Sequence, residues 1–337
     1  REIEKDGFRI DYKNDMELVS DTSYAICKSM GKELAGFADI FEEADLDMLV
    51  LLGDRFEIQM AAVAAMLYRI PVAHIHGGEL TQGLMDDAIR HSVTKMSDLH
   101  FTSTSEYAQR VIQMGEQPER VFCVGALGIE NIKSIRLLSR EQLCQKFGDI
   151  FLHNYIMVTY HPVTLEKHTA GIQFQKLLNV VENHPEYHYI FTYANADTDG
   201  AIINKMIESY TQEHKNTKAF VSMGQLGYLS ALQHCSAVLG NSSSGIIEAP
   251  SFHIPTINIG DRQKGRVRAK TVIDCGYETR DIEQALTESQ NQKFKDLCQE
   301  STNPYEGKNT SEQIIMQIKK YLNQVQGKQK IFYDIEV

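Results

Sequence analysis

Two stretches in the first half of the chain place titratable side chains directly after apolar runs. In MLVLLGDRFE the run is followed by Gly53 and Asp54, and in PVAHIHGGE it ends at His74 and His76, with Glu79 close behind. Such runs predict buried parallel strands, whose carboxyl ends are where open α/β sheets bind ligands. Histidine and carboxylate groups gathered at that edge are suited to proton transfer. Asp54 alone is explained equally well as a cap of the helix that follows.

The predicted helix after HIHGGE begins with further titratable residues, namely Asp86, Asp87, Arg90 and His91. Three interpretations of this segment compete. His74 and His76 could bind a divalent metal ion together with a carboxylate, because H-x-H is a known ligand spacing. Alternatively, the acidic residues cap a helix and His74 is a hydrogen-bonded core residue. We favour the third interpretation, which is acid/base chemistry by histidines and carboxylates of different pKa.

In the second half, VLGNSSSGIIEA predicts a strand that ends in a tight turn and opens a helix. Backbone N–H groups, the positive end of the helix and the hydroxyl groups of Ser242, Ser243 and Ser244 converge there, which is how phosphate is bound. The lysine of a Walker A loop is absent, which argues against ATP hydrolysis of that type. Glu248, one turn into the helix, is placed to accept hydrogen bonds from ribose hydroxyls, with a solvated helix glutamate as the alternative.

Two further motifs follow predicted strands of the second half. INIGDRQKGRVRAK brings a basic cluster into an acidic chain, and its Arg262 is best placed to neutralise a diphosphate, although such clusters are usually solvated loops. In VTYHPVT, Pro162 ends the strand and fixes His161 at its carboxyl end. A supporting or surface role is the alternative for this histidine. Taken with the serine loop, His161 is predicted to belong to a phosphate and leaving-group site.

The elements that must position these groups form two series of alternating short strands and helices. The first series runs from about Asp45, and the second starts near Asn154. This pattern predicts an α/β protein with two Rossmann-like domains, residues 1–150 and 151–309, and a single large barrel is the alternative at this length.

The two ends of the chain differ from this pattern. KNTSEQIIMQIKKYL predicts an amphipathic helix over 310–325, in which Thr310 and Gln313 fit a capping box. Residue 1 is arginine. The first forty-odd residues do not show the strand–helix–strand order with which such a domain begins. We therefore expect the first strand and helix of the N-terminal domain to be missing.

Composition argues against several classes of function. The chain has 337 residues, 42% hydrophobic and 23% charged, as in ordinary globular proteins. Its 34 basic and 45 acidic residues give a net charge of -11, so neither nucleic acid nor an anionic membrane is an expected partner. Six scattered cysteines without a C-x-x-C pair predict reduced thiols. No apolar stretch has membrane-spanning length and no signal peptide is visible, so we place the protein in the cytoplasm.

In chain order, the motifs GDRFE, HIHGGE, DDAIRH, YHPVT, GQLGYL, GNSSSGIIEA and INIGDRQKGR resemble those of the hydrolysing UDP-N-acetylglucosamine 2-epimerases of sialic acid biosynthesis. The resemblance spans about Asp47 to Leu322. It implies a GT-B fold, in which two Rossmann-like domains face a cleft and a C-terminal helix packs back on the first domain. It also implies conversion of UDP-GlcNAc and water to N-acetylmannosamine and UDP through 2-acetamidoglucal, with no nucleotide cofactor and no metal ion.

The resemblance also assigns roles to individual residues. The implied catalytic residues are Asp54, His76, Glu79, Asp86 and His161. The implied UDP-sugar contacts are Arg90, His91, Asn195, Asp197, Asn241, Ser242, Ser243, Ser244, Gly245, Glu248 and Arg262. Well-known relatives carry a glutamate at His76, and imidazole, with an ordinary pKa of about 6.5, is suited to the same proton transfer. A second departure is the lack of the family's first strand and its Gly-Thr-Arg type loop, which helps to hold the diphosphate.

Other functions stay open at this point. A close variant would act on UDP-2,4-diacetamido-trideoxyglucose in legionaminic acid synthesis. A GT-B glycosyltransferase would need an acceptor and would leave the histidine and carboxylate cluster without a role. A non-catalytic UDP-sugar-binding protein would bind without turnover. Because the resembling family forms dimers, we expect a homodimer or a higher homo-oligomer.

Overall fold

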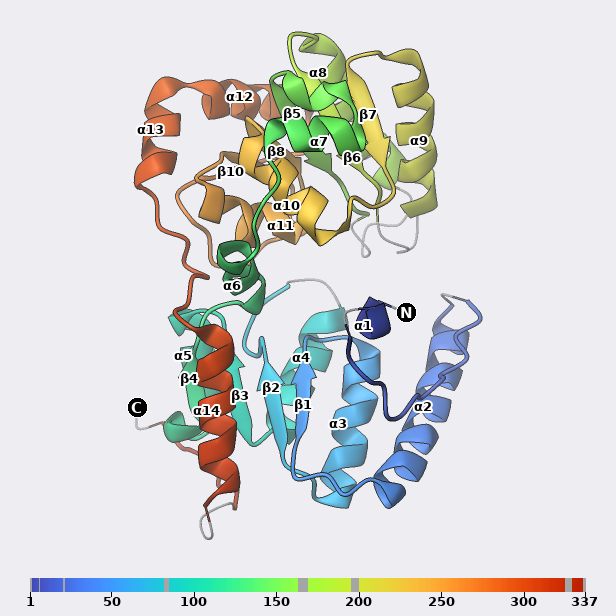
Figure 1. The fold of residues 1–337 in the computed structure, drawn as a ribbon, viewed down its shortest axis with the longest axis vertical. Coiled ribbons are helices and arrows are strands. Elements are labelled where there is room, and N and C mark those ends of the chain that lie inside the picture. Colours follow the sequence, from blue (N-terminus) through green and yellow to red (C-terminus); the bar gives the residue numbers. More distant parts are fainter. Residues whose placement is uncertain are drawn as a thin grey trace. The chain divides into compact units, whose positions relative to one another are not determined.

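The computed structural model of the chain describes residues 2–5, 7–20, 22–81, 85–162, 169–194, 200–324 and 329–335. The chain forms two compact units, each built around a parallel sheet (Figure 1). No helix within these ranges is long and apolar enough to cross a membrane. The first unit comprises Arg1–Glu79, Met85–Cys123 and Glu312–Val337, and the second comprises Leu80–Leu84 and Val124–Ser311.

The sheet of the first unit has four parallel strands in the order β1-β2-β3-β4. Every residue of β2 and β3 is buried, as predicted for strands covered on both faces, whereas Val50 and Leu52 of the edge strand β1 are exposed. Because the strands are parallel, the turns after β1 and β2 lie at the same edge of the sheet. The elements are β1 (Leu49–Leu52), α3 (Phe56–Tyr68), β2 (Val72–Ile75), α4 (Met85–Met96), β3 (Leu99–Thr102), α5 (Ser105–Gln113), the 3₁₀ turn Pro118–Arg120 and β4 (Val121–Cys123).

A long helix, α2 (Ser23–Glu43), precedes the first strand and follows the short α1 (Glu2–Lys5). The first helix of this domain was expected from the sequence to be missing, and α2 shows that a long helix is present before β1. Two of the four buried positions of α2, Ser29 and Glu33, are polar, so the apolar stripe that identifies a helix is interrupted. Phe41 nevertheless packs the helix into the core that it shares with α3.

The sheet of the second unit has six parallel strands in the order β10-β9-β8-β5-β6-β7. The chain starts in the middle at β5, proceeds outward to β7, and then crosses to β8 on the other side of β5. Open α/β sheets bind ligands where the strand order reverses in this way, beyond the carboxyl ends of the two strands. The strands are β5 (Tyr155–Thr159), β6 (His188–Thr192), β7 (Thr217–Phe220), β8 (Ala237–Gly240), β9 (Thr256–Ile259) and β10 (Val272–Cys275).

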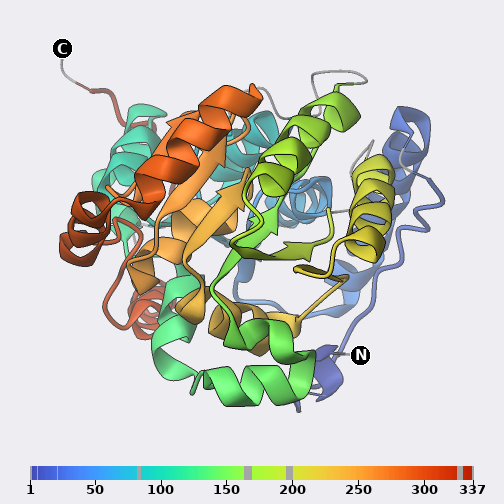
Figure 2. The same ribbon diagram turned by 90° about the horizontal axis from the view of Figure 1, so that it is seen from above.

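Three helices of the second unit, α8, α9 and α12, pack their apolar side chains on one face of this sheet (Figures 1 and 2). β10, α12 and α13 were not predicted from the sequence. No residue of β10 is buried, and the buried stripe of α12 has only Ile282 and Leu286 as large apolar side chains, so both patterns are weak. The helices are α6 (Leu127–Ser134), α7 (Arg140–Phe147), α8 (Ala170–Asn183), α9 (Gly200–Glu213), α10 (Gly224–His234), α11 (Ser243–Ile247), α12 (Thr279–Gln290) and α13 (Gln292–Glu300), with 3₁₀ turns at Asp149–Leu152 and Ala249–Phe252.

The boundary between the first and second units falls after Cys123, whereas the sequence predicted it at residue 150. Helices α6 and α7 group with the second unit instead. The Leu138 N–H donates to Oγ of Ser230 at 2.9 Å, and the Arg140 guanidinium donates to the carbonyl of His234 at 2.8 Å. These polar contacts join the connecting segment to α10, which the hydrophobic pattern alone did not indicate.

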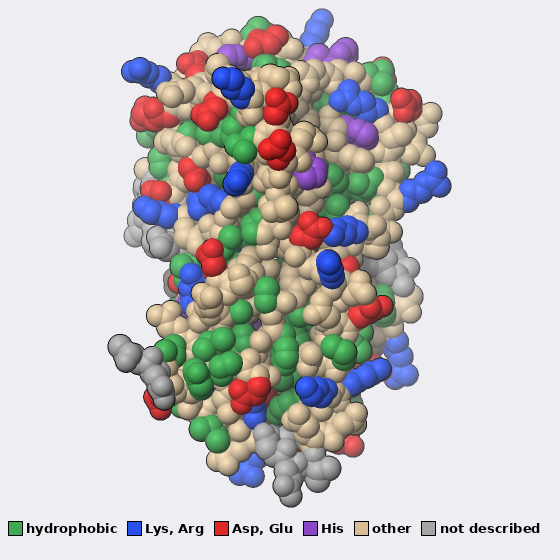
Figure 3. Space-filling model, turned by 90° about the vertical axis from the view of Figure 1, so that its left-hand side faces the viewer, with side chains coloured by type: hydrophobic (Ala, Val, Ile, Leu, Met, Phe, Trp, Pro, Cys, Tyr) green, Lys and Arg blue, Asp and Glu red, His purple; other side chains and the backbone are tan. Residues whose placement is uncertain are grey.

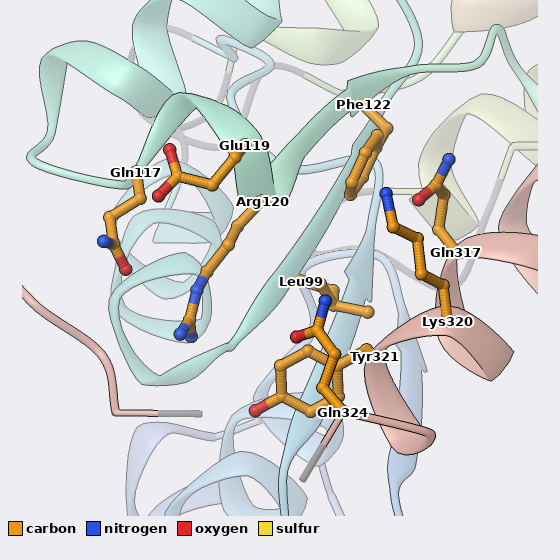
Figure 4. Close-up of a pocket in the computed structure, with 9 residues that line it drawn as sticks. All are labelled: Leu99, Gln117, Glu119, Arg120, Phe122, Gln317, Lys320, Tyr321 and Gln324. Carbon is orange, nitrogen blue, oxygen red and sulfur yellow. The ribbon is translucent and has the colours of Figure 1, made fainter. Parts of the chain in front are cut away.

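The C-terminal helix α14 (Thr310–Leu322) returns to the first unit, where Tyr321 is buried. Figure 4 shows Tyr321 beside Arg120 and Leu99, next to a cavity of about 180 Å³. The Tyr321 hydroxyl donates to Oδ1 of Asp98 at 3.3 Å, and the Arg120 guanidinium lies 5.8 Å from the centre of the tyrosine ring. The helix begins at Thr310, as predicted, and ends at Leu322, before the predicted residue 325.

Candidate functional site

The first predicted carboxylate, Asp54, lies in the turn after β1. Gly53 turns the chain there with a left-handed φ of 96°, which glycine adopts without strain. The side chain of Arg90, on α4, is 1% exposed and its guanidinium binds the Asp54 carboxylate. It also donates to Oδ1 of Asp87 at 3.0 Å and to the carbonyl of Glu79 at 2.8 Å. Arg90 therefore holds two carboxylates in place, rather than presenting its charge to solvent.

The second group is a histidine and glutamate pair in the turn after β2. Nδ1 of His76 lies 2.9 Å from Oε1 of Glu79, and Ser103 donates to the same oxygen at 2.9 Å. Glu79 is 4% exposed, whereas the side chain of His76 is 21% exposed. A neutral imidazole that donates from Nδ1 to this carboxylate carries its lone pair on Nε2, where it can accept a proton. The turn needs Gly78, because a Cβ there would lie 2.4 Å from the carbonyl of Tyr107.

His74, the other histidine of the H-x-H spacing, faces the interior. Its Nε2 lies 2.8 Å from the Gly53 carbonyl and its Nδ1 lies 3.2 Å from Oγ1 of Thr94. Burial lowers the pKa of His74 to about 3, so the ring is neutral. Because both ring nitrogens have partners, His74 and His76 do not form the metal-ligand pair considered from the sequence. Among the described residues, no group of three or more potential ligand side chains could hold a metal ion.

The remaining predicted residues of α4 lie in its first two turns. Asp86 is half-buried in the first turn. His91 is also half-buried, with Nε2 3.8 Å from Oδ2 of Asp87, and burial lowers its pKa. Both belong to the helix that carries Arg90, so one helix positions three of the predicted groups.

In the second unit, Asn241 joins the loops that follow three strands. Its buried side chain accepts from the N–H of His161 at 2.7 Å and donates to the carbonyl of His161 at 2.8 Å. Its backbone carbonyl accepts from Arg262 at 3.3 Å and from Nε2 of Gln263 at 2.9 Å. The structure thus brings together His161 after β5, Asn241 after β8 and Arg262 after β9, at the point where the strand order reverses.

The serine loop follows directly. Gly240 is required before it, because a Cβ there would lie 1.9 Å from the carbonyl of Thr159. Ser242 caps α11 by accepting from the Ser244 N–H at 3.4 Å. The hydroxyl of Tyr228 on α10 donates to Oγ of Ser244 at 2.9 Å.

The remaining predicted residues of this loop are Gly245, which is buried, and Ser243 and Glu248, which are half-buried. Burial, and then the nearby Arg262 charge, lower the pKa of His161 to about 4. At neutral pH this ring is therefore an uncharged imidazole, which can donate one hydrogen bond but is not a charged acid.

Two predicted substrate contacts, Asn195 and Asp197, lie outside the described residues. Sequence reasoning missed the partners Ser103, Thr94 and Tyr228. Tyr228 belongs to the motif GQLGYL, so it could have been selected from the sequence. A single hydroxyl residue such as Ser103 belongs to no recognisable motif.

Two units of parallel sheet, with candidate site residues at the carboxyl ends of the strands, define a Rossmann-like α/β protein. The predicted fold is confirmed by a solved structure, the UDP-GlcNAc 2-epimerase of Neisseria meningitidis bound to UDP-GlcNAc. It matches with a TM-score of 0.79 and 20% identity, over 94% of this chain and 87% of that one. The chain belongs to the UDP-N-acetylglucosamine 2-epimerase family, whose model matches residues 1–319.

Two curated relatives are considerably more similar in sequence. The polysialic acid biosynthesis protein P7 of Escherichia coli is 41% identical over 99% of this chain and 85% of its own length. The hydrolysing GDP/UDP-N,N'-diacetylbacillosamine 2-epimerase of Campylobacter jejuni is 40% identical over 88% of this chain and 76% of its own. The predicted family is therefore confirmed.

Proposed function

We propose that the chain hydrolyses UDP-GlcNAc to N-acetylmannosamine and UDP, with inversion at C2, for sialic acid biosynthesis. The family, and the similarity to a protein named for polysialic acid biosynthesis, support this proposal. The observation that carries it is the pairing of His76 with the buried Glu79, beside the Asp54 and Arg90 pair. A glutamate that fixes the proton on Nδ1 leaves Nε2 as a base, which is the group that an elimination at a sugar carbon requires.

The proposed reaction has two steps and needs no cofactor. A base removes the proton from C2, the C2–H electron pair forms a C1–C2 double bond, and the C1–O bond breaks so that UDP leaves with its electron pair. Water then adds its hydroxyl group to C1 of the 2-acetamidoglucal, and a proton returns to C2 on the opposite face. Removal and return on opposite faces call for two proton-transfer groups, for which we propose His76 and one of the carboxylates Asp54 and Asp86.

The residues of the second unit would bind the departing UDP. Arg262 and the hydroxyl groups of Ser242 and Ser243 are proposed to hold the diphosphate, and Glu248 the ribose. His161 would donate a hydrogen bond from a neutral ring, which stabilises negative charge on the leaving phosphate without transferring a proton. Arg90 is engaged by carboxylates, so we propose a positioning role for it instead of the predicted substrate contact.

A second candidate substrate is UDP-N,N'-diacetylbacillosamine, a 2,4-diacetamido-trideoxyglucose. The 40% identity to the Campylobacter jejuni relative, whose name contains this sugar, favours it. The chemistry at C1 and C2 is the same for both sugars, so the machinery described above serves either. The ratio of the two kcat/KM values decides between them.

The function is tested by incubating the full chain with each sugar nucleotide without any acceptor and separating the products. The proposal predicts UDP and a 2-epimeric free sugar in equal amounts. UDP release only in the presence of an added acceptor would instead identify a glycosyltransferase. Saturable UDP binding without turnover of either sugar would identify a binding protein.

We also propose a homodimer. Exposed apolar side chains, including Ile315 and Met316 of α14, are compatible with it, and Figure 3 shows hydrophobic side chains gathered on the side of the first unit that carries this helix. Light scattering on the full chain tests the assembly. A mass near twice that of the 38.2 kDa chain is expected, and the mass of a single chain would contradict it.

A further inference from the structure

His74 is a buried titratable group that the proposed reaction does not use directly. It lies on β2, and the side chain is completely buried. Its Nε2 lies 2.8 Å from the carbonyl of Gly53, which can only accept, so the ring proton resides on Nε2. The residue after this carbonyl is Asp54, so the bond fixes the backbone from which the candidate carboxylate projects.

Packing does not hold this turn by itself. Gly53 has a left-handed φ of 96°, and a Cβ built on it would meet no atom within 4 Å. Its N–H donates to the carbonyl of Ile75 at a long 3.2 Å. The bond from His74 is the shorter of these two contacts to the Gly53 backbone, and it acts together with the Arg90 guanidinium that binds the Asp54 side chain.

The other side of the same ring faces the partner of that carboxylate. Oγ1 of Thr94 lies 3.2 Å from Nδ1 of His74 and 3.0 Å from the backbone carbonyl of Arg90, one turn back along α4. The hydroxyl proton is thus shared between two acceptors, the ring and the helix carbonyl. Through Thr94, His74 is connected to the backbone of the arginine that binds Asp54.

We propose that His74 is a positioning residue that sets the Asp54 turn and the Arg90 backbone relative to one another from behind the site. The proposal rests on the proposed function, since it assumes that Asp54 takes part in proton transfer. The ring bonds to the carbonyl of the residue before Asp54 and, through Thr94, reaches the backbone of Arg90, so it helps to set the separation of the two charged groups. Displacement of a reacting group by about 1 Å can cost roughly 100-fold in rate, so a small loosening here is measurable.

The test compares two substitutions of His74 in the full chain. His74→Gln keeps an amide N–H at a position from which it can donate to the Gly53 carbonyl, whereas His74→Leu removes both hydrogen bonds. We expect His74→Leu to lower kcat by about tenfold or more with KM changed less than about twofold, and His74→Gln to recover most of the loss. Equal losses in the two variants, or KM rising in step with the fall in kcat, would overturn the proposal.

A matched pair, Thr94 on α4 and Ser97 directly after it, controls for the loss of a buried hydroxyl group. Thr94→Val and Ser97→Ala each remove a buried hydroxyl that bonds to the carbonyl four residues earlier, but only Thr94 contacts His74. Thr94→Val should lower kcat and Thr94→Ser restore it, with Ser97→Ala near wild type. If Ser97→Ala lowers kcat as much as Thr94→Val, the effect is one of general stability and the proposal is wrong. If His74→Leu does not fold, the comparison of Thr94→Val with Ser97→Ala still tests the proposal.

A second readout is independent of turnover. Hydrogen–deuterium exchange of peptides over residues 49–56 should be faster in His74→Leu than in wild type and unchanged in Ser97→Ala. Unchanged exchange in His74→Leu would refute the positioning role whatever the activity. If the wild-type chain turns over neither sugar nucleotide, the proposed function fails, and the exchange result still decides whether His74 holds the turn.

Discussion

Nδ1 of His76 and Oε1 of Glu79 lie 2.9 Å apart, which is the same separation as Nε2 of His100 and Oε2 of Glu116 in the same unit. The two pairs differ in exposure. The His100 ring is completely buried, while the His76 side chain is 21% exposed. Only the first pair can therefore pass a proton to a ligand, and the second provides a control built into the same fold.

Glu79→Gln tests the role of the first pair. The amide is similar in size but lacks the charge that holds a proton on Nδ1 of His76, so kcat should fall by about 100-fold with little change in KM. Glu116→Gln removes the matching carboxylate from the buried pair and should lower the melting temperature without a comparable loss of kcat. Steady-state kinetics and thermal unfolding of both variants provide the comparison. Similar losses of kcat in the two would contradict the assignment.

Asp54→Asn separates chemistry from binding in the first unit. The substitution removes a negative charge beside Arg90 and a proposed proton-transfer group, but leaves the residues proposed to bind UDP unchanged. We expect kcat to fall by about 100-fold or more while the Kd for UDP, measured by calorimetry, stays within about threefold. A loss of UDP affinity as large as the loss of kcat would show that Asp54 belongs to the binding site.

Arg262→Ala should have the opposite profile. Loss of a charge-assisted contact to the diphosphate should weaken UDP binding by about 10- to 100-fold, because such bonds contribute about 1.5 to 3 kcal/mol. Arg268→Ala is the control, since this neighbouring arginine is paired with Asp274 at 2.9 Å. Calorimetric titration of UDP into both variants is the measurement. Equal weakening by the two substitutions would indicate a general effect of positive charge in this loop.

The buried histidines predict a loss of stability in mild acid. The pKa values of His74 and His161 are lowered to about 3 and about 4, so the folded chain keeps both rings neutral while the unfolded chain protonates them below about 6.5. Their stabilisation is complete above pH 6.5 and is lost as the pH falls towards the folded values. Each ring should cost about 1.4 kcal/mol per pH unit in that window. Urea unfolding at pH 7.5 and 5.5 measures the difference.

His161→Gln provides the control for this pH dependence. Without that ring, the free energy of unfolding should fall by about 1.4 kcal/mol less between pH 7.5 and 5.5 than in wild type. A variant that loses as much stability as wild type over this interval would show that His161 is not held neutral in the folded chain.

Chelation distinguishes the proposed acid/base site from a metal site. His74 is bonded to the Gly53 carbonyl and Thr94, and His76 to Glu79, so the H-x-H spacing does not present two available ligands. We expect dialysis against EDTA to leave kcat unchanged. Loss of activity that zinc restores would contradict this account of the two histidines.

The elements with regular hydrophobic patterns were predictable from the sequence, and those with interrupted patterns were not. α3 belongs to the series predicted from about Asp45, and its apolar run from Met60 to Tyr68 is continuous. α2 was missed because Ser29 and Glu33 lie on its buried face, where only packing against α3 makes a helix favourable. Local pattern therefore predicted the strands and helices around the site, but not the elements that depend on tertiary contacts.

The same limit applies to the site. The spacing of His74 and His76 allowed a metal site, a core histidine or acid/base chemistry. The choice depended on the direction in which each ring points, which is set by Gly53, Thr94 and Glu79 from three different segments. Residues that follow a strand could be predicted to lie at one edge, because parallel strands end together. Their hydrogen-bond partners could not, because these come from other parts of the sheet and from α4.

The most direct test of the central claim is incubation of the full chain with UDP-GlcNAc in D2O, followed by proton NMR, with UDP-N,N'-diacetylbacillosamine in parallel. The account predicts free UDP together with a 2-epimeric sugar that carries deuterium at C2, because the proton removed by the base is replaced from solvent. Free UDP together with unepimerised N-acetylglucosamine that keeps its C2 proton would show simple hydrolysis of the C1–O bond, and would contradict the elimination assigned to His76, Glu79 and Asp54.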